Sequence, residues 1–215
     1  MQGNSGEIEY NKAFDYLRKG EGENAARCFE NAIRLGHTPA YSYLAEIYEN
    51  GTRGFPRDRA KAFELYKQRL NIPFSEAAPK PLLSILRMGC LYCEGGDGIQ
   101  HNPAVGEMLI NDALQEVERK GGYFPPDDYY RAASAYWGSS SHGLMSLCDS
   151  EFTRAIEYIT KAKGCLEKAL YCWNDPDSNY YNDDIYGNRK RVEEMHKLAE
   201  EQLEHVKMMQ NLDKP

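Results

Sequence analysis

Residues 40–70 read AYSYLAEIYENGTRGFPRDRAKAFELYKQRL. Apolar residues recur at helical spacing at the beginning of this stretch and again at its end, which predicts two amphipathic helices. Between them, Gly51 and Gly54 permit a tight connection, Phe55 is expected to plug it, and Asp58 is placed to cap the second helix. The stretch therefore predicts a helical hairpin.

Three further segments, at residues 11–37, 88–113 and 132–162, show the same succession of two apolar-striped helices joined by a turn or linker. The second helix of each unit carries a small residue at the matching place, namely Ala25, Ala62, Gly106 and Ala155. Two helices approach closely only where one side chain is a hydrogen or a methyl group. We therefore expect these four positions to lie where the helices of a hairpin cross.

The composition agrees with an all-helical fold. Only four valines occur in 215 residues, whereas strands depend on β-branched side chains. The net charge of −7 and the thin spread of Lys and Arg provide no basic stripe, so nucleic acid is not an expected ligand. No 18-residue apolar run is present and the first ten residues lack the pattern of a signal peptide. The expected location is the cytoplasm, with no membrane partner.

Residues 40–70 resemble a Sel-1-like repeat, the longer-looped relative of the tetratricopeptide repeat. The residues that carry the resemblance are Ala40, Leu44, Tyr48, Gly51, Gly54, Phe55, Asp58, Lys61, Ala62 and Tyr66. The third unit matches through Gly89, Tyr92 and Gly95 but has Asn102 and Gly106 where the family favours Asp and Ala. The fourth unit lacks the glycine-bearing loop.

The resemblance implies an α-solenoid of about four antiparallel helical hairpins in a right-handed superhelix, closed by a C-terminal capping helix. The expected boundaries are a tail at 1–7, repeat units at 8–37, 38–71, 79–121 and 126–172, a polar loop at 173–187 and the capping helix at 188–212. The resemblance also implies that the protein is a non-enzymatic scaffold or adaptor, which binds a protein or peptide in its concave groove.

If the units stack as in that family, the first helix of each hairpin lines the groove. The expected partner-binding residues are Tyr10, Phe14, Arg18, Ser42, Glu46, Glu49, Asn50, Leu86, Cys90, Cys93, Glu94, Tyr130, Ser134 and Trp137. Aromatic side chains are typical interface anchors. Glu46, Glu49 and Glu94 favour a basic or N-terminal partner segment.

Few residues suggest chemistry, and we expect no catalytic residue, metal or cofactor. Cys90 and Cys93 form a lone CxxC with only His101 nearby, and the loop at 174–188 begins like a calcium loop but has Tyr180 and Tyr186 where glycine and glutamate are needed. Residues 139–142 match no nucleophile motif. The alternative function is a metal-binding or small-ligand accessory protein that uses the CxxC or this loop.

The last helix, from 188 to 212, carries one apolar stripe among dense charges. This pattern suits the closed end of a solenoid. Met195, Met208 and Met209 could instead seal a dimer, although a monomer is the expected state.

Overall fold

The computed structural model describes residues 5–51, 55–74, 81–141, 149–178 and 188–212. The regular structure in these segments consists of helices and includes no strand, which confirms the predicted all-helical class. The helices are α1 (Ser5–Lys19), α2 (Gly22–Arg34), α3 (Ala40–Asn50), α4 (Arg59–Asn71), α5 (Leu82–Glu94), α6 (Pro103–Arg119), α7 (Pro126–Ser141), α8 (Asp149–Asn174) and α9 (Arg189–Leu212).

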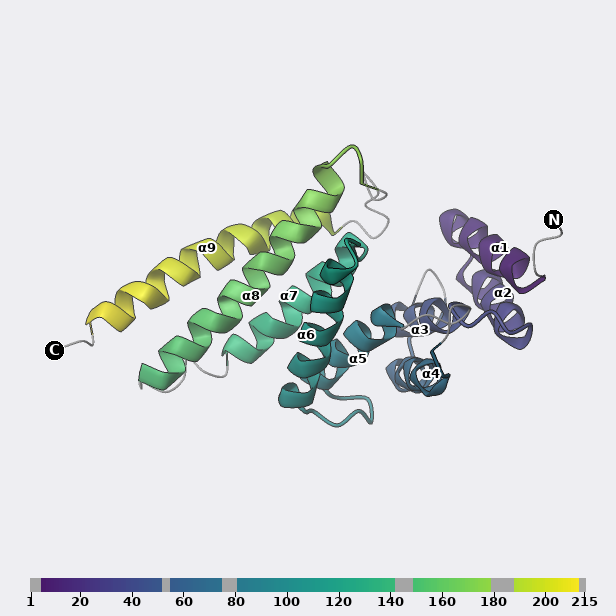
Figure 1. Ribbon diagram of the computed structural model, residues 1–215, viewed down its shortest axis with the longest axis horizontal. Helices are drawn as coiled ribbons and strands as arrows, with labels where there is room; N and C mark the ends of the chain where they lie inside the picture. The colour runs from purple at the N-terminus through teal and green to yellow at the C-terminus, as the bar shows by residue number, and fades with distance from the viewer. Residues whose placement is uncertain (1–4, 52–54, 75–80, 142–148, 179–187, 213–215) are drawn as a thin grey trace.

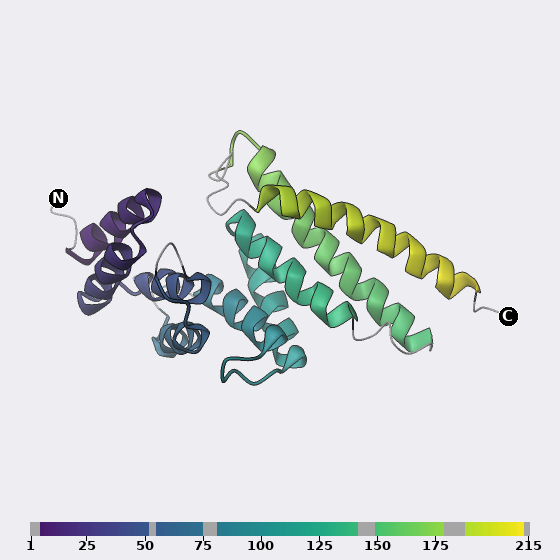
Figure 2. The same cartoon turned by 180° about the vertical axis from the view of Figure 1, so that it is seen from behind.

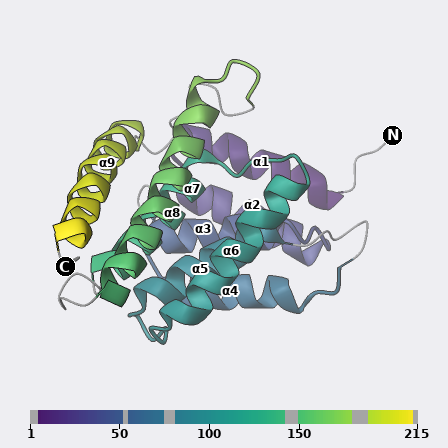
Figure 3. The same ribbon diagram turned by 60° about the vertical axis from the view of Figure 1, so that its left-hand side comes forward.

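The helices pack largely in chain order. α1 lies on α2, α3 on α4, α5 on α6 and α7 on α8, while contacts of α2 with α3, α4 with α5 and α5 with α7 join one pair to the next. Figure 1 shows an elongated molecule with the termini at opposite ends, and Figure 2 shows the same succession from behind. α9 runs alongside α8 at the C-terminal end (Figure 3). None of the helices in the described segments has the apolar length that a lipid bilayer would require.

The first helix begins earlier than the sequence pattern predicts. A tail was expected up to residue 7, whereas α1 starts at Ser5. The reason is tertiary packing: Gly6 is buried, and a Cβ atom at this position would lie 3.0 Å from the Cβ of His37 and 3.3 Å from that of Leu35. The turn after α2 therefore holds the start of α1 in place.

Two hydrophobic clusters share α5. Met88 and Leu91 face the N-terminal cluster, while Ile85, Leu86 and Cys90 face the C-terminal one. α5 is therefore the element through which the two halves of the core meet.

The helices α5 and α6 cross at two glycines. A Cβ atom at Gly106 would lie 2.6 Å from the carbonyl oxygen of Gly89 and 2.5 Å from the Sγ of Cys93. Of the other three small positions predicted at helix crossings, Ala25 and Ala62 are fully buried and Ala155 is 1% exposed. At Gly106 the helices are so close that even a methyl group does not fit.

Asp58 caps α4, as the sequence predicts. Its side chain accepts a hydrogen bond from the backbone N–H of Lys61 at 2.9 Å.

We expect Asp58→Ala to lower the free energy of unfolding by about 1 kcal/mol, because a backbone N–H at the helix start loses its acceptor. Chemical denaturation followed by circular dichroism measures this. Asp15→Ala, at an exposed position inside α1, is the matched control and should change stability by less than about 0.5 kcal/mol. Equal effects of the two substitutions would contradict the capping role.

Candidate functional site

A pocket of about 280 Å³ opens where α3, α5 and α7 meet. Glu46 and Asn50 on α3 and Arg87 and Glu94 on α5 form part of its wall. The rest of the wall comes from Asp127, Tyr130, Arg131 and Ser134 on α7 and from Asn188, just before α9. The pocket thus draws on the first helices of three successive helix pairs.

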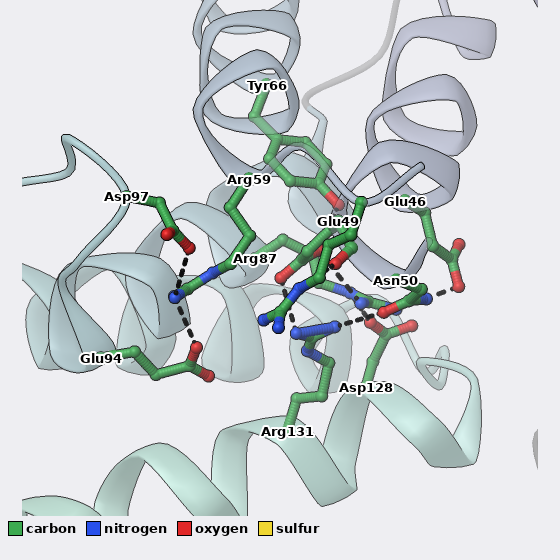
Figure 4. A network of polar contacts seen from close by, with 11 residues as sticks. Glu46, Glu49, Asn50, Arg59, Tyr66, Arg87, Glu94, Asp97, Asp128 and Arg131 are labelled. Carbon is green, nitrogen blue, oxygen red and sulfur yellow. Dashed lines mark hydrogen bonds and ion pairs between the residues drawn. The ribbon is translucent and has the colours of Figure 1, made fainter. Parts of the chain in front are cut away.

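A buried ionic cluster centres on Arg87, one of the residues that line this pocket (Figure 4). Arg87 donates through Nε to Asp128, through Nη1 to Glu49 at 3.3 Å and through Nη2 to Glu46 at 3.2 Å. The side chains of Arg87 and Asp128 are each 1% exposed and that of Glu49 is fully buried. One guanidinium therefore joins α3, α5 and α7 inside the molecule.

Glu49 is held by two more partners. Tyr66 on α4 donates its hydroxyl hydrogen to Oε2 at 2.8 Å, and Arg131 on α7 forms an ion pair with Oε1 at 2.7 Å. Burial raises the pKa of Tyr66 well above its ordinary value, and the neighbouring Glu49 carboxylate adds to this effect. The tyrosine therefore acts as a neutral hydrogen-bond donor to Glu49.

The charges of Arg87 and Asp128 respond differently to burial. Burial alone lowers the pKa of Arg87, but the three carboxylates around it raise that pKa well above its ordinary value, so the guanidinium stays charged. Burial raises the pKa of Asp128 to about 7, although Arg87 opposes this rise. Such a cluster is stable only while its charges remain paired.

Ion pairs and hydrogen bonds also connect the helices around the rim of the pocket. Arg59 on α4 donates to Glu94 at 2.7 Å and to Asp97 at 3.2 Å, and Figure 4 shows it reaching between these two carboxylates. Arg131 donates to the side-chain oxygen of Asn50 at 2.9 Å. These contacts connect the second, third and fourth helix pairs around the opening.

At the start of α9, Asn188 donates to Asp127 at 2.8 Å. Because Asp127 stands in the first turn of α7, this hydrogen bond ties the beginning of the last helix to the pocket wall.

Five of the sequence-predicted binding residues meet at this place: Glu46, Asn50, Glu94, Tyr130 and Ser134 line the pocket. They come from α3, α5 and α7, the first helices of three of the pairs, whereas α1, the first helix of the remaining pair, contributes no residue to the pocket. Glu49 does not line the pocket and is fully buried, so its assignment to an accessible groove is corrected: it is an interior partner of Arg87.

Other predicted binding residues lie inside the molecule. Leu86 and Cys90 have no exposed area, so their assignment to an accessible groove is corrected: they are core residues, because the apolar face of α5 is covered by α6 and α7. Ser42 is buried and shares a 2.8 Å hydrogen bond with Ser84. Cys93 is half-buried, with its Sγ 3.9 Å from the carbonyl oxygen of Pro103. Trp137 is half-buried against the C-terminal core.

The N-terminal members of the predicted set are separate from the pocket. Tyr10 and Phe14 form edge contacts with each other and with Tyr43 of α3, with ring centroids 4.9 to 5.6 Å apart. These rings pack α1 against α3, so their role in the structure is inter-helix packing. Arg18 is exposed and pairs with Asp15 at 2.7 Å.

The sequence pattern did not predict a role for Arg87, Arg131, Asp127, Asp128 or Asn188. One signal for Arg87 was present, because it is the only charged residue in the run LLSILRMGCLYC that precedes Glu94. A lone charge within an apolar helix indicates a buried group that needs a partner. In the sequence, the other four residues look like ordinary polar surface residues, and nothing in the local pattern marks them as part of a site.

Of the residues considered for metal binding, the structure describes Cys90, Cys93 and His101 but only the two ends of the loop at 174–188. Burial raises the pKa of the Cys90 thiol well above its ordinary value, and this cysteine and Cys93 face different neighbours. Within the described segments, no group of three or more His, Cys, Asp or Glu residues is arranged to hold a metal ion. Most of the loop at 174–188, with Tyr180 and Tyr186, and His142 of the 139–142 cluster lie outside the described residues. The five described cysteines are free thiols.

Comparison with known proteins gives no family for this chain: no protein-family model and no curated protein matches it. The function is therefore argued from the pocket. Its walls are carboxylates and guanidiniums in mutual contact, with one tyrosine, one serine and two amides. This arrangement can bind a polar or charged group by hydrogen bonds and electrostatic attraction.

Proposed function

We propose that the chain is a non-enzymatic interaction module that binds a protein or peptide in the pocket between α3, α5 and α7. In this proposal the four helix pairs form a Sel-1-like or tetratricopeptide-like right-handed superhelix with α9 as its capping helix. The proposed state is a monomer in the cytoplasm, a location with which the free thiols of the described cysteines agree.

The observation that carries the proposal is the convergence of the first helices on one hollow. α3, α5 and α7 each follow a connection and precede the partner helix of their own pair, and each places polar side chains on the pocket wall. Repeat proteins bind extended partners on such composite surfaces, because no single repeat is large enough to do so.

The rigidity of the pocket also supports a binding role. Arg87 is bonded to Glu46, Arg131 to Asn50 and Arg59 to Glu94, so these side chains of the pocket wall are held in place before a partner arrives. Binding to a preorganised surface loses less conformational entropy than binding to a mobile one.

Changing the shape of the pocket should weaken partner binding. We expect Ser134→Phe, which places an aromatic ring in the cavity, and Tyr130→Ala, which removes an aromatic wall, each to weaken binding at least about tenfold. Proteins retained from lysate of the native host by the wild type are identified by mass spectrometry. The affinity of each purified candidate is then measured by isothermal titration calorimetry with the wild type and both variants.

Two substitutions outside the pocket serve as controls. Met108→Ala on α6 and Tyr171→Ala on α8 remove side chains that are 61% and 50% exposed, and neither residue lines the pocket. Both should retain the partner at wild-type affinity. If the pocket variants fold normally and bind every partner as the wild type does, the proposal fails.

A further inference from the structure

The hydrogen-bond donors of the pocket are mostly bonded within the protein, whereas at least one of its carboxylates can still accept hydrogen bonds. Arg87 engages Nε, Nη1 and Nη2 with carboxylates, and Arg131 engages its two Nη atoms with Glu49 and Asn50, while its Nε is buried without a hydrogen-bond partner. The guanidinium donors that line the pocket are thus largely used within the protein. A carboxylate, in contrast, has about four acceptor sites, so Glu94 keeps acceptor capacity after its single bond to Arg59.

The charges around the pocket have a negative excess. Five carboxylates stand in or directly under the wall, those of Glu46, Glu49, Glu94, Asp127 and Asp128, against three guanidiniums, those of Arg59, Arg87 and Arg131. The excess stays negative when Asp128 carries a proton. Asp97 adds a further carboxylate beside Arg59.

The position of the charges matters as much as their number. Arg87 is 1% exposed and surrounded by three acidic groups, which cancel its field toward the pocket. Glu94 is 36% exposed at the rim, where its negative charge is accessible to a ligand. Tyr130 adds an aromatic ring to the wall, and aromatic faces attract cations.

The volume limits the occupant to a small group. At about 280 Å³ the pocket lies just below the range typical of drug-sized ligands, which begins at about 300 Å³. We infer that this pocket accepts one basic side chain, the guanidinium of arginine or the ammonium of lysine, from the bound partner. This inference rests on the proposed function and names the feature of the partner that the pocket recognises.

In this arrangement the cation donates to Glu94 at the rim and lies within the field of Glu46 and Asp127 deeper in the wall. The amide of Asn50 stands at the end of α3 beside the opening, where it can donate to a backbone carbonyl of the same partner segment. One basic residue is thereby recognised by both its charge and its backbone.

The test uses blocked tripeptides and the ¹⁵N-labelled full chain. Acetyl-Gly-Arg-Gly-amide is titrated while backbone amide signals are followed by NMR, and the same peptide with citrulline, which has the shape of arginine without its charge, is the matched probe. We expect the arginine peptide to shift the signals of residues 46–50, 94 and 127–134. The citrulline peptide should bind about tenfold more weakly or not at all.

A pair of protein variants checks the site. Glu94→Gln removes the accessible charge at the rim and should weaken binding of the arginine peptide about fivefold to tenfold. Glu64→Gln on α4 removes a carboxylate that is 58% exposed and pairs with Lys67 outside the pocket, and it should leave binding unchanged. Equal binding of the arginine and citrulline peptides, or equal effects of the two variants, would overturn the inference.

The outcomes separate this inference from the proposed function. If Ser134→Phe loses the partner but the arginine peptide shifts no pocket signal, the inference fails and the proposed function stands. If the arginine peptide binds as described but no partner depends on the pocket, the proposed function fails and the cation site stands.

Discussion

Replacing Arg87 with methionine is expected to lower the free energy of unfolding by about 3 to 5 kcal/mol. The guanidinium is the common partner of Asp128, Glu49 and Glu46, and it is 1% exposed. Its loss leaves three acidic groups near each other in the interior with only Arg131 to compensate them. Methionine retains much of the side-chain volume, so the effect reports the unpaired charges and not a cavity.

Guanidinium chloride or urea denaturation of the two proteins measures this effect. Arg59→Met is the matched control: the same substitution breaks ion pairs to Glu94 and Asp97, whose side chains are 36% and 59% exposed. Because exposed carboxylates are stabilised by water when they lose a partner, this variant should lose at most about 1 kcal/mol. If Arg87→Met were as mild as Arg59→Met, the ionic cluster would not be the joint between the helix pairs.

Replacing Gly106 with alanine is expected to destabilise the protein by about 3 kcal/mol. Alanine normally favours a helix over glycine by about 1 kcal/mol, so the ordinary expectation has the opposite sign. Here the added methyl group would lie 2.6 Å from the carbonyl oxygen of Gly89, a backbone atom of α5 that cannot rotate away. The two helices must separate, and this loosens the packing of α6 on α5.

Gly164→Ala provides the control on α8. A Cβ atom there meets nothing within 4 Å, so this substitution should stabilise the protein by about 0.5 to 1 kcal/mol. Thermal and chemical denaturation of the two variants should therefore give effects of opposite sign. A neutral or stabilising Gly106→Ala would show that the crossing of α5 and α6 is looser than its geometry indicates.

The helices themselves could be read from the sequence because their signals are local. Apolar spacing of 3.6 residues, the cap at Asp58 and the turn at Gly51, whose φ is 64°, each depend on residues only a few positions apart. The small residues of the second helices were found because they recur at the matching place of each repeated unit. At Gly106 the crossing leaves no room for a larger side chain, because the carbonyl oxygen of Gly89 lies 2.6 Å from the place of a Cβ atom.

About half of the residues of the candidate site could be predicted from the sequence. The face of the first helices gave Glu46, Asn50, Glu94, Tyr130 and Ser134, since these positions follow from the helical period once the apolar stripe is known. The helical period could not show that the same face of α1 places Tyr10 and Phe14 in contact with Tyr43. A helical period identifies one face of a helix, but it does not identify which neighbour covers that face.

The amino-acid order alone was enough to establish the helical class and the helix ends at Asp58 and Gly51, because these follow from interactions within one or two helical turns, and the repeated unit marked the small residues at the crossings. The tertiary structure was needed to find the ionic cluster, in which Arg87 contacts Glu49, 38 positions before it, and Asp128, 41 positions after it. Such pairings depend on how whole helices stack, and burial then makes each charge depend on partners that no local pattern specifies.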